Sequence, residues 1–275
     1  MDRYIFEQFI TQIDSEQASD FFKYLIVNAQ EKVDTKKKRY LTYYPQDSKE
    51  IELTIENNKD KKGKLNIQDF TFHHKSNQVW EFKIVKSMNK FRNTYIVNRT
   101  DDTGTKCIRL VKEDVLNKEL KPGTIIKAQV CGIVMLADIY QNEEEYKKSI
   151  PADENGNKTV MHDGYLIAYN LFVNNSSKLT EEERQSRNHT RDNLLTFKSK
   201  LKNVEEIEIN MFNLELPNYY KATIDTTLGE LDIIIPRSLA SRQLEDGNVI
   251  FGELLLTGNI CIDKYTKLIK ENTED

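Results

Sequence analysis

The chain has 275 residues, of which 38% are apolar and 31% are charged, and its formal net charge at pH 7 is −4. This length suffices for one large domain or two ordinary ones. No apolar run approaches the roughly 18 to 20 residues that a membrane helix needs, so we exclude a helical membrane protein. The N-terminal residues lack the layout of a secretory signal, and we therefore expect a cytoplasmic protein.

Residues 1–78 are predicted to form an N-terminal helix followed by a β-hairpin. Apolar residues recur at helical spacing over the first 30 residues, with a break and a new cap near Asp14-Ser15. From Ile51 onward the period changes to two, and a polar turn over 57–63 separates two alternating runs. We expect the helix to pack on the body of the protein.

The most informative pattern in the chain is an internal repeat. When the sequence is shifted by 124 positions, similar residues coincide at Tyr95/Tyr219, Val111/Ile235, Leu120/Leu244, Gly123/Gly247 and Ile126/Ile250. A repeat at this separation predicts two related β-rich units, over 79–140 and over 205–275, the second including a C-terminal tail. The residues just before Tyr95 and Tyr219 do not match, so the alignment is approximate.

Each unit is predicted to contain four strands, with a Leu-x-x-Gly turn before the last one. We expect strands over 80–86, 94–99, 106–111 and 124–136, and again near 206–211, 219–225, 230–235 and 248–256. Glycine suits the left-handed turn that would begin such a strand. A curled antiparallel sheet of this kind resembles small OB-like barrels, and other small barrels would give the same pattern. The expected fold class is α+β with two β-barrel-like units.

Residues 141–204 are expected to form a helical insertion between the two units. A short charged helix over 142–149, a polar loop and an apolar strand over 165–173 come first. Thr180 and Glu183 then form a capping box that would begin a helix running to about Asn203. One face of this helix would carry four basic residues: Arg184, Arg187, Arg191 and Lys198. They predict either a ridge that binds phosphates or carboxylates or, as we favour, a solvated face beside a buried stripe.

A basic segment carries the clearest indication of nucleic-acid binding. Residues 31–100 hold 16 Lys and Arg against 9 Asp and Glu, so this segment has a charge of +7 and the remainder −11. Lysines that neutralise phosphates and tyrosines that stack on bases are the combination used by single-strand binders. The segment contains both: Lys36, Lys37, Lys38 and Arg39, then Tyr43, with Lys61 and Lys62 on the hairpin turn. A solvated loop beside core tyrosines would give the same pattern.

The sequence contains no motif for catalysis, a cofactor or a metal ion. The adjacent His73 and His74 would direct their rings to opposite faces of a strand, and no spacing matches a zinc site. A nucleophile elbow and a phosphate-binding glycine loop are both missing. The acidic run over 143–145 predicts a solvated face, while a carboxylate pair brought together from distant strands stays open. The three cysteines, too few for a disulfide framework, are expected to be small buried side chains: Cys107, Cys131 and Cys261.

From these observations we expect a non-enzymatic cytosolic binding protein that grips a protein partner, as a regulatory or immunity-type inhibitor would. The overall acidity and the sheet edges and helices that could dock a partner favour this function. The alternative is a single-stranded nucleic-acid-binding protein that uses the basic segment and an OB-like barrel. The residues that these two hypotheses predict for binding are Lys36, Lys37, Lys38, Arg39, Tyr43, Lys61, Lys62, Arg184, Arg187 and Arg191.

Overall fold

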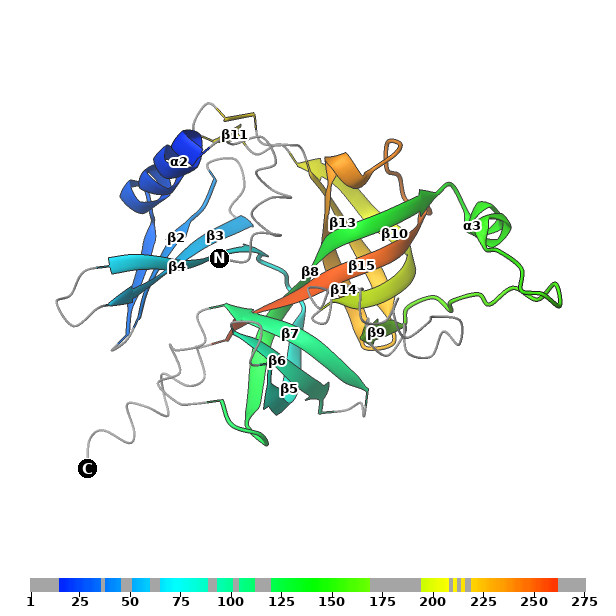
Figure 1. Ribbon diagram of the computed structural model, residues 1–275, viewed down its shortest axis with the longest axis horizontal. Helices are drawn as coiled ribbons and strands as arrows, with labels where there is room; N and C mark the ends of the chain where they lie inside the picture. The colour runs from blue at the N-terminus through cyan, green and yellow to red at the C-terminus, as the bar shows by residue number, and fades with distance from the viewer. Residues whose placement is uncertain are drawn as a thin grey trace.

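The structure is a computed structural model that describes residues 15–35, 38–45, 51–59, 65–88, 93–100, 104–111, 120–168, 194–207, 210–211, 214–215 and 219–261. This part of the chain is mostly β-sheet, arranged as a nine-stranded, a four-stranded and a two-stranded sheet with two α-helices (Figure 1). The expectation of a sheet-rich α+β protein is therefore confirmed. No helix within the described ranges is long and apolar enough to cross a membrane.

The N-terminal part is a four-stranded antiparallel sheet with one helix packed on it. Its elements are α2 (Ser15–Val27), β1 (Glu31–Asp34), β2 (Lys38–Tyr43), β3 (Ile51–Lys59) and β4 (Leu65–His74), and the strands follow one another in sheet order. The predicted hairpin is the pair β3–β4. Phe21 and Leu25, one helical turn apart on α2, are buried, and the ring of Phe21 lies 6.1 Å from that of Phe70. The helix thus packs on the four-stranded sheet.

Both faces of β3 are buried, which its alternating sequence does not indicate. The apolar side chains of this strand face α2 and belong to a hydrophobic cluster that continues into the large sheet through Ile133 and Leu255. The polar side chains on the opposite face are covered as well, since Glu52 accepts a hydrogen bond of 3.0 Å from Asn259 and Glu56 one of 2.9 Å from Asn93. The four-stranded sheet is therefore held between a helix and the rest of the protein.

The large sheet contains nine strands and most of the hydrophobic core. Its strands are β5 (Val79–Ser87), β6 (Thr94–Arg99), β7 (Thr105–Val111), β8 (Ile125–Tyr140), β9 (Leu166–Ala168), β10 (Leu195–Ile207), β13 (Tyr219–Thr226), β14 (Gly229–Pro236) and β15 (Val249–Ile260). The remaining elements are α3 (Glu143–Ser149), the 3₁₀ turn η3 (Arg237–Leu239) and the two-stranded sheet of β11 (Asn210–Met211) and β12 (Leu214–Glu215).

The strand pairings of the large sheet trace two closed circuits that share the antiparallel pair β8–β15. One circuit runs from β8 through β5, β6 and β7 to β15, where β7 and β15 are parallel. The other runs from β15 through β10, β13 and β14 to β8, where β14 and β8 are parallel. The two circuits therefore use their strands in the same order and with the same directions.

Corresponding turns precede β8 and β15. Gly123 and Gly247 both have a φ of +89°, which confirms the left-handed conformation predicted for the two Leu-x-x-Gly turns. The amide of Gly123 donates to the carbonyl of Ile84 at 2.8 Å, and that of Gly247 donates to the carbonyl of Leu201 at 2.8 Å. These bonds join the turn before β8 to β5 and the turn before β15 to β10.

The prediction of a helix that runs to about Asn203 is wrong from Leu195 onward, because Leu195–Ile207 form strand β10. Leu194, Phe197 and Leu201 have helical spacing, but Leu195, Phe197 and Leu201 also fit the alternation of a strand. Pairing with β9, β13 and β15 decides between the two periods, since tertiary contacts override a local preference of this size. The helical insertion predicted over 141–204 therefore ends in a core strand, and its residues 169–193 lie outside the described part of the chain.

Candidate binding pocket

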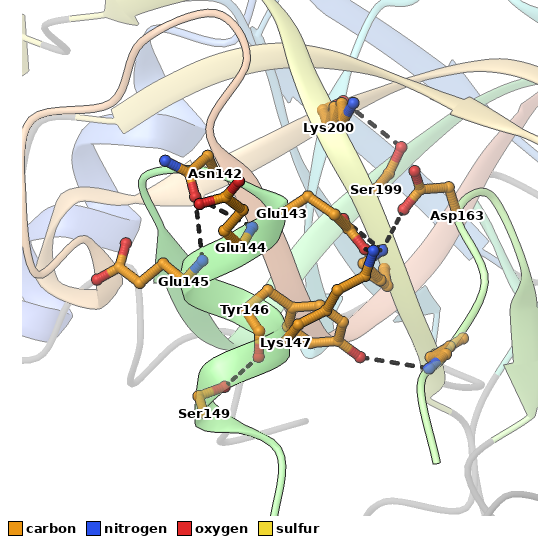
Figure 2. A network of polar contacts seen from close by, with 12 residues as sticks. Asn142, Glu143, Glu144, Glu145, Tyr146, Lys147, Ser149, Asp163, Ser199 and Lys200 are labelled. Atoms are coloured by element: carbon orange, nitrogen blue, oxygen red, sulfur yellow. Dashed lines mark hydrogen bonds and ion pairs between the residues drawn. The ribbon is translucent and has the colours of Figure 1, made fainter. Parts of the chain in front are cut away.

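Helix α3 is short, but its ends are well stabilised. The side-chain oxygen of Asn142 caps the helix by accepting hydrogen bonds from the amides of Glu144 at 3.1 Å and Glu145 at 3.0 Å (Figure 2). Acidic residues occupy the first turn, and Lys147 and Lys148 the last, as the helix dipole favours. The charged helix predicted over 142–149 is confirmed.

A cavity of about 660 Å³ lies where this helix meets the ends of β8 and β15. Its walls come from α3, from the chain between α3 and β9, from β9 itself and from the two strands. They are formed by Asp138, Tyr140, Tyr146, Ser149, Ile150, Pro151, Thr159, Val160, Met161, His162, Tyr165, Ile167 and Phe251. The volume falls within the range of roughly 300 to 1,000 Å³ that is typical of ligand pockets.

Aromatic rings form the deeper wall of the pocket. Tyr146 is buried, and its ring centroid lies 5.3 Å from that of Tyr140 and 6.0 Å from that of Phe251. His162 and Tyr165 form a second aromatic pair in the pocket wall, with centroids 6.1 Å apart. Such side chains offer large contact area with few rotatable bonds, which is the composition of binding hot spots.

A buried lysine contacts the ring of Tyr146 in this wall. Lys198 on β10 is only 2% exposed, and its Nζ lies 2.7 Å from a carboxylate oxygen of Glu143 and 2.6 Å from one of Asp163. The same Nζ lies 4.6 Å from the ring centroid of Tyr146, within cation–π range. Burial alone would lower the pKa of Lys198, but the hydrogen bonds to Asp163 and Glu143 outweigh it and raise the pKa above its usual value. Glu143 and Asp163 therefore point toward one charge from α3 and from the following loop (Figure 2).

Further hydrogen bonds hold the loop that closes the pocket. The ammonium of Lys158 donates to the carbonyl of Lys147 at 2.8 Å, at the C-terminal end of α3. The amide of Gly164 donates to the carbonyl of Lys198 at 2.9 Å, and the carbonyl of Gly164 accepts from Thr227 at 2.8 Å. On the other side of α3, Arg242 pairs with Glu145 at 3.0 Å. These contacts fix the walls of the pocket, and fixed walls lose less entropy when a ligand binds.

A second polar cluster lies between the four-stranded and the nine-stranded sheet and is buried. The Nδ1 atom of His73 lies 3.0 Å from the hydroxyl of Thr257 and 3.7 Å from the sulfur of Cys131. All three side chains are fully buried, and burial raises the pKa of the Cys131 thiol to about 11. A neutral, inaccessible thiol is a poor nucleophile, so this cluster joins the sheets rather than forming an active site.

The cysteines should differ sharply in reactivity. Near pH 8 we expect a disulfide reagent such as Ellman's reagent to modify the half-exposed Cys261 in the native protein, and to reach the buried Cys107 and Cys131 only after unfolding. Counting released thiolate with and without denaturant checks this. Mass-spectrometric detection of modified Cys131 under native conditions would contradict it.

The Cys131 thiol should also contribute to the pH dependence of stability. Its pKa is raised from about 9 to about 11 on folding, so its contribution is complete below pH 9 and is lost as the pH rises through 11. The free energy of unfolding of the wild type should therefore fall by roughly 1–3 kcal/mol over this interval. Cys131→Ala should show a correspondingly smaller fall in urea titrations.

The basic segment predicted to bind nucleic acid is largely neutralised where the structure describes it. Lys38 on β2 pairs with Glu56 at 3.1 Å, and Arg39 pairs with Asp34 at 2.9 Å. Tyr43 is only 3% exposed and belongs to the core beneath α2. The other predicted binding residues lie outside the described residues: Lys36, Lys37, Lys61, Lys62, Arg184, Arg187 and Arg191.

The pocket itself was not predicted from the sequence. Tyr140 and Tyr146 belong to different elements, and Phe251 follows more than a hundred residues later, so no local pattern links them. Glu143, expected on a solvated face, pairs instead with Lys198, and Lys198 is a buried strand residue rather than part of a helical ridge. Within the described ranges, no group of three or more His, Cys, Asp or Glu side chains is placed to hold a metal ion. No protein-family model and no curated protein matches the sequence.

Proposed function

We propose that this chain is a non-enzymatic binding protein whose α3 pocket receives a side chain of a protein partner. The observation that carries the proposal is the cavity with aromatic walls, held in place by the ion pairs of the buried Lys198. An exposed rim surrounds the cavity, since Tyr165 is 48% exposed and the loop before it is largely open to solvent. A partner could contact this rim while one of its side chains fills the cavity, as interface anchors do.

The described residues give less support to the binding of single-stranded nucleic acid. Binding of single strands requires unneutralised cations beside accessible aromatic rings. Lys38 and Arg39 are already paired with carboxylates, and the ring of Tyr43 is buried. We further propose a cytosolic location, because all three cysteines are thiols and two of them are buried in strands.

We also propose that the chain contains a duplicated unit and that each circuit of strands curls into a small barrel. The strand orders β8-β5-β6-β7 and β15-β10-β13-β14 support this origin. In the β8–β15 ladder, Val130 pairs with Gly258 and Val134 pairs with Leu254. The repeat relates Val130 to Leu254 and Val134 to Gly258, so it converts one of these pairs into the other. Gly132 and Leu256, which are also 124 positions apart, pair with each other at the centre of this symmetric arrangement. That is the relation expected if two copies of one unit pair through their last strands.

Selection from a random peptide library on the immobilised protein tests the proposed binding function. We expect enriched peptides that bind the wild type and lose affinity about tenfold against Tyr165→Ala, which removes half-exposed pocket wall without opening the core. The matched control is Ile125→Ala, which removes a similarly exposed side chain (49%) far along β8. If no peptide is enriched, or if Tyr165→Ala and Ile125→Ala bind alike, the pocket is not the binding site.

A further inference from the structure

The surroundings of the pocket are acidic. Residues 138–168, which supply most of the pocket walls, contain seven carboxylates against three lysines. Lys198 and Arg242 pair with three of these carboxylates, which changes the formal charge of the region from −4 to −2. Asp138 belongs to the wall itself, and its side chain is exposed at the pocket edge. The helix beside the pocket begins with three glutamates. A positively charged ligand would therefore be attracted to this opening, and a negatively charged one repelled.

The side chains that line the pocket are also suited to binding a cation. The faces of tyrosine and phenylalanine rings attract cations, most strongly where water is excluded. Lys198 already holds its ammonium against one such ring, that of Tyr146, at 4.6 Å. The rings of Tyr140, Tyr165 and Phe251 line the cavity that a ligand would enter, with Asp138 among them. Apolar atoms of Ile167 and Met161 complete the wall, and these would contact an alkyl chain.

We propose that the residue received by this pocket is a basic side chain, arginine or lysine, of the protein partner. Its alkyl stem lies along the apolar wall, and its cation lies between the aromatic rings and the carboxylate of Asp138. This inference rests on the proposed binding function and specifies the chemistry of the anchor. A protein side chain is favoured over a free small cation because the loop over 151–159, which borders the cavity through Pro151 and Thr159, is exposed and offers a surface for neighbouring residues of a partner.

The test uses peptides from the selection described above, synthesised with single changes at the anchor. Citrulline replaces arginine with nearly the same shape and no charge, and norleucine does the same for lysine. We expect either replacement to weaken binding about tenfold in isothermal titration calorimetry. In the protein, Asp138→Asn should produce a similar loss, whereas Asp20→Asn should not. Asp20 is an exposed carboxylate on α2, at the opposite end of the molecule from α3 (Figure 1).

A double-mutant cycle then shows whether the two charges meet. If they do, the citrulline or norleucine peptide should bind the wild type and Asp138→Asn with similar affinity, because the second change removes an interaction that is already lost. Losses that simply multiply would overturn the inference. So would selected peptides anchored in the pocket by leucine or phenylalanine, although the binding function itself would then stand.

A second arm separates a partner side chain from a free small cation. N-acetyl-arginine methylamide carries the side chain without neighbouring residues. We expect it to bind at least tenfold more weakly than an arginine-anchored peptide, because it lacks the contacts with the rim. Equal affinity would identify the occupant as a small cation and overturn the assignment to a protein partner. Failure to enrich any peptide would overturn the binding function and this inference together.

Discussion

Replacing Gly252 with alanine is expected to lower the free energy of unfolding by about 3 kcal/mol or more. Gly252 pairs with Ala137 in the β8–β15 ladder that both circuits of strands share. A Cβ atom at this position would overlap the backbone oxygen of Leu136 and would lie 3.0 Å from the Cα of Ala137. These are backbone atoms of a paired strand, so neither can turn away as a side chain would.

To relieve this overlap, β8 and β15 would have to move apart where Gly252 pairs with Ala137. The ladder shifts register directly beyond this point, between Glu253 and Leu254, so Gly252 lies beside a β-bulge. Urea unfolding followed by circular dichroism measures the loss, and the midpoint should fall without a change of slope.

Gly156→Ala is the control for this substitution. Gly156 has a φ of +80°, and a Cβ atom there would meet no heavy atom within 4 Å. Its replacement should cost only about 1–2 kcal/mol, the usual penalty for a side chain in the left-handed conformation. If both variants lose the same amount, the close approach at Gly252 is not what requires glycine there.

Replacing Lys198 with methionine is expected to cost about 2 kcal/mol and to abolish detectable binding of pocket-directed peptides. The change keeps the length and apolar stem of the side chain but leaves Glu143 and Asp163 without the ammonium between them. Loss of one partner from a fully buried pair costs more, but Asp163 is 49% exposed, so solvent moderates the repulsion. Because α3 and the following loop are joined through this charge, the pocket wall should loosen.

Lys200→Met provides the matched control, since Lys200 lies two residues further on β10 and is exposed. We expect its stability and peptide affinity to stay close to those of the wild type. Thermal melting and calorimetric titration of the two variants give both readouts. A wild-type-like affinity for Lys198→Met would show that the buried lysine does not maintain the pocket.

Because the pKa of Lys198 is raised, the pH dependence of stability should distinguish the two variants. Its contribution to stability is fully present below the usual lysine value and is lost as the pH rises through the higher pKa of the folded protein. Lys198→Met should lack this alkaline component, while Lys200→Met should retain it.

Much of the sheet could be predicted because its signals are local. Period-two alternation located β3 and β4, and the Leu-x-x-Gly turns located the starts of β8 and β15 through glycines that need a positive φ. The helix expected to run to Asn203 failed at β10, where the same apolar residues satisfy either period and only pairing with distant strands decides. Burial of the polar face of β3 is equally non-local, since it depends on Asn259 and Asn93.

The pocket depends almost entirely on such distant contacts. Its aromatic wall unites Tyr140, Tyr146 and Phe251, and its support unites Glu143 with Lys198. Sequence patterns assigned the charged members of this set to solvent, because lysine and glutamate are usually exposed. Here Lys198 is buried and Glu143 is partly buried, because the ion pair between them offsets the cost of removing the charges from water. A candidate site of this kind can be recognised only once the strands are paired.

The first residues of β8 and β15 are 124 positions apart, and the ladder between them is the longest among the described strands. Contacts at such separation form slowly, because the intervening chain must lose much of its conformational freedom before they stabilise it. Each circuit needs both strands in order to close. The two circuits should therefore assemble and melt together as one cooperative unit, since one hydrophobic cluster contains side chains of both.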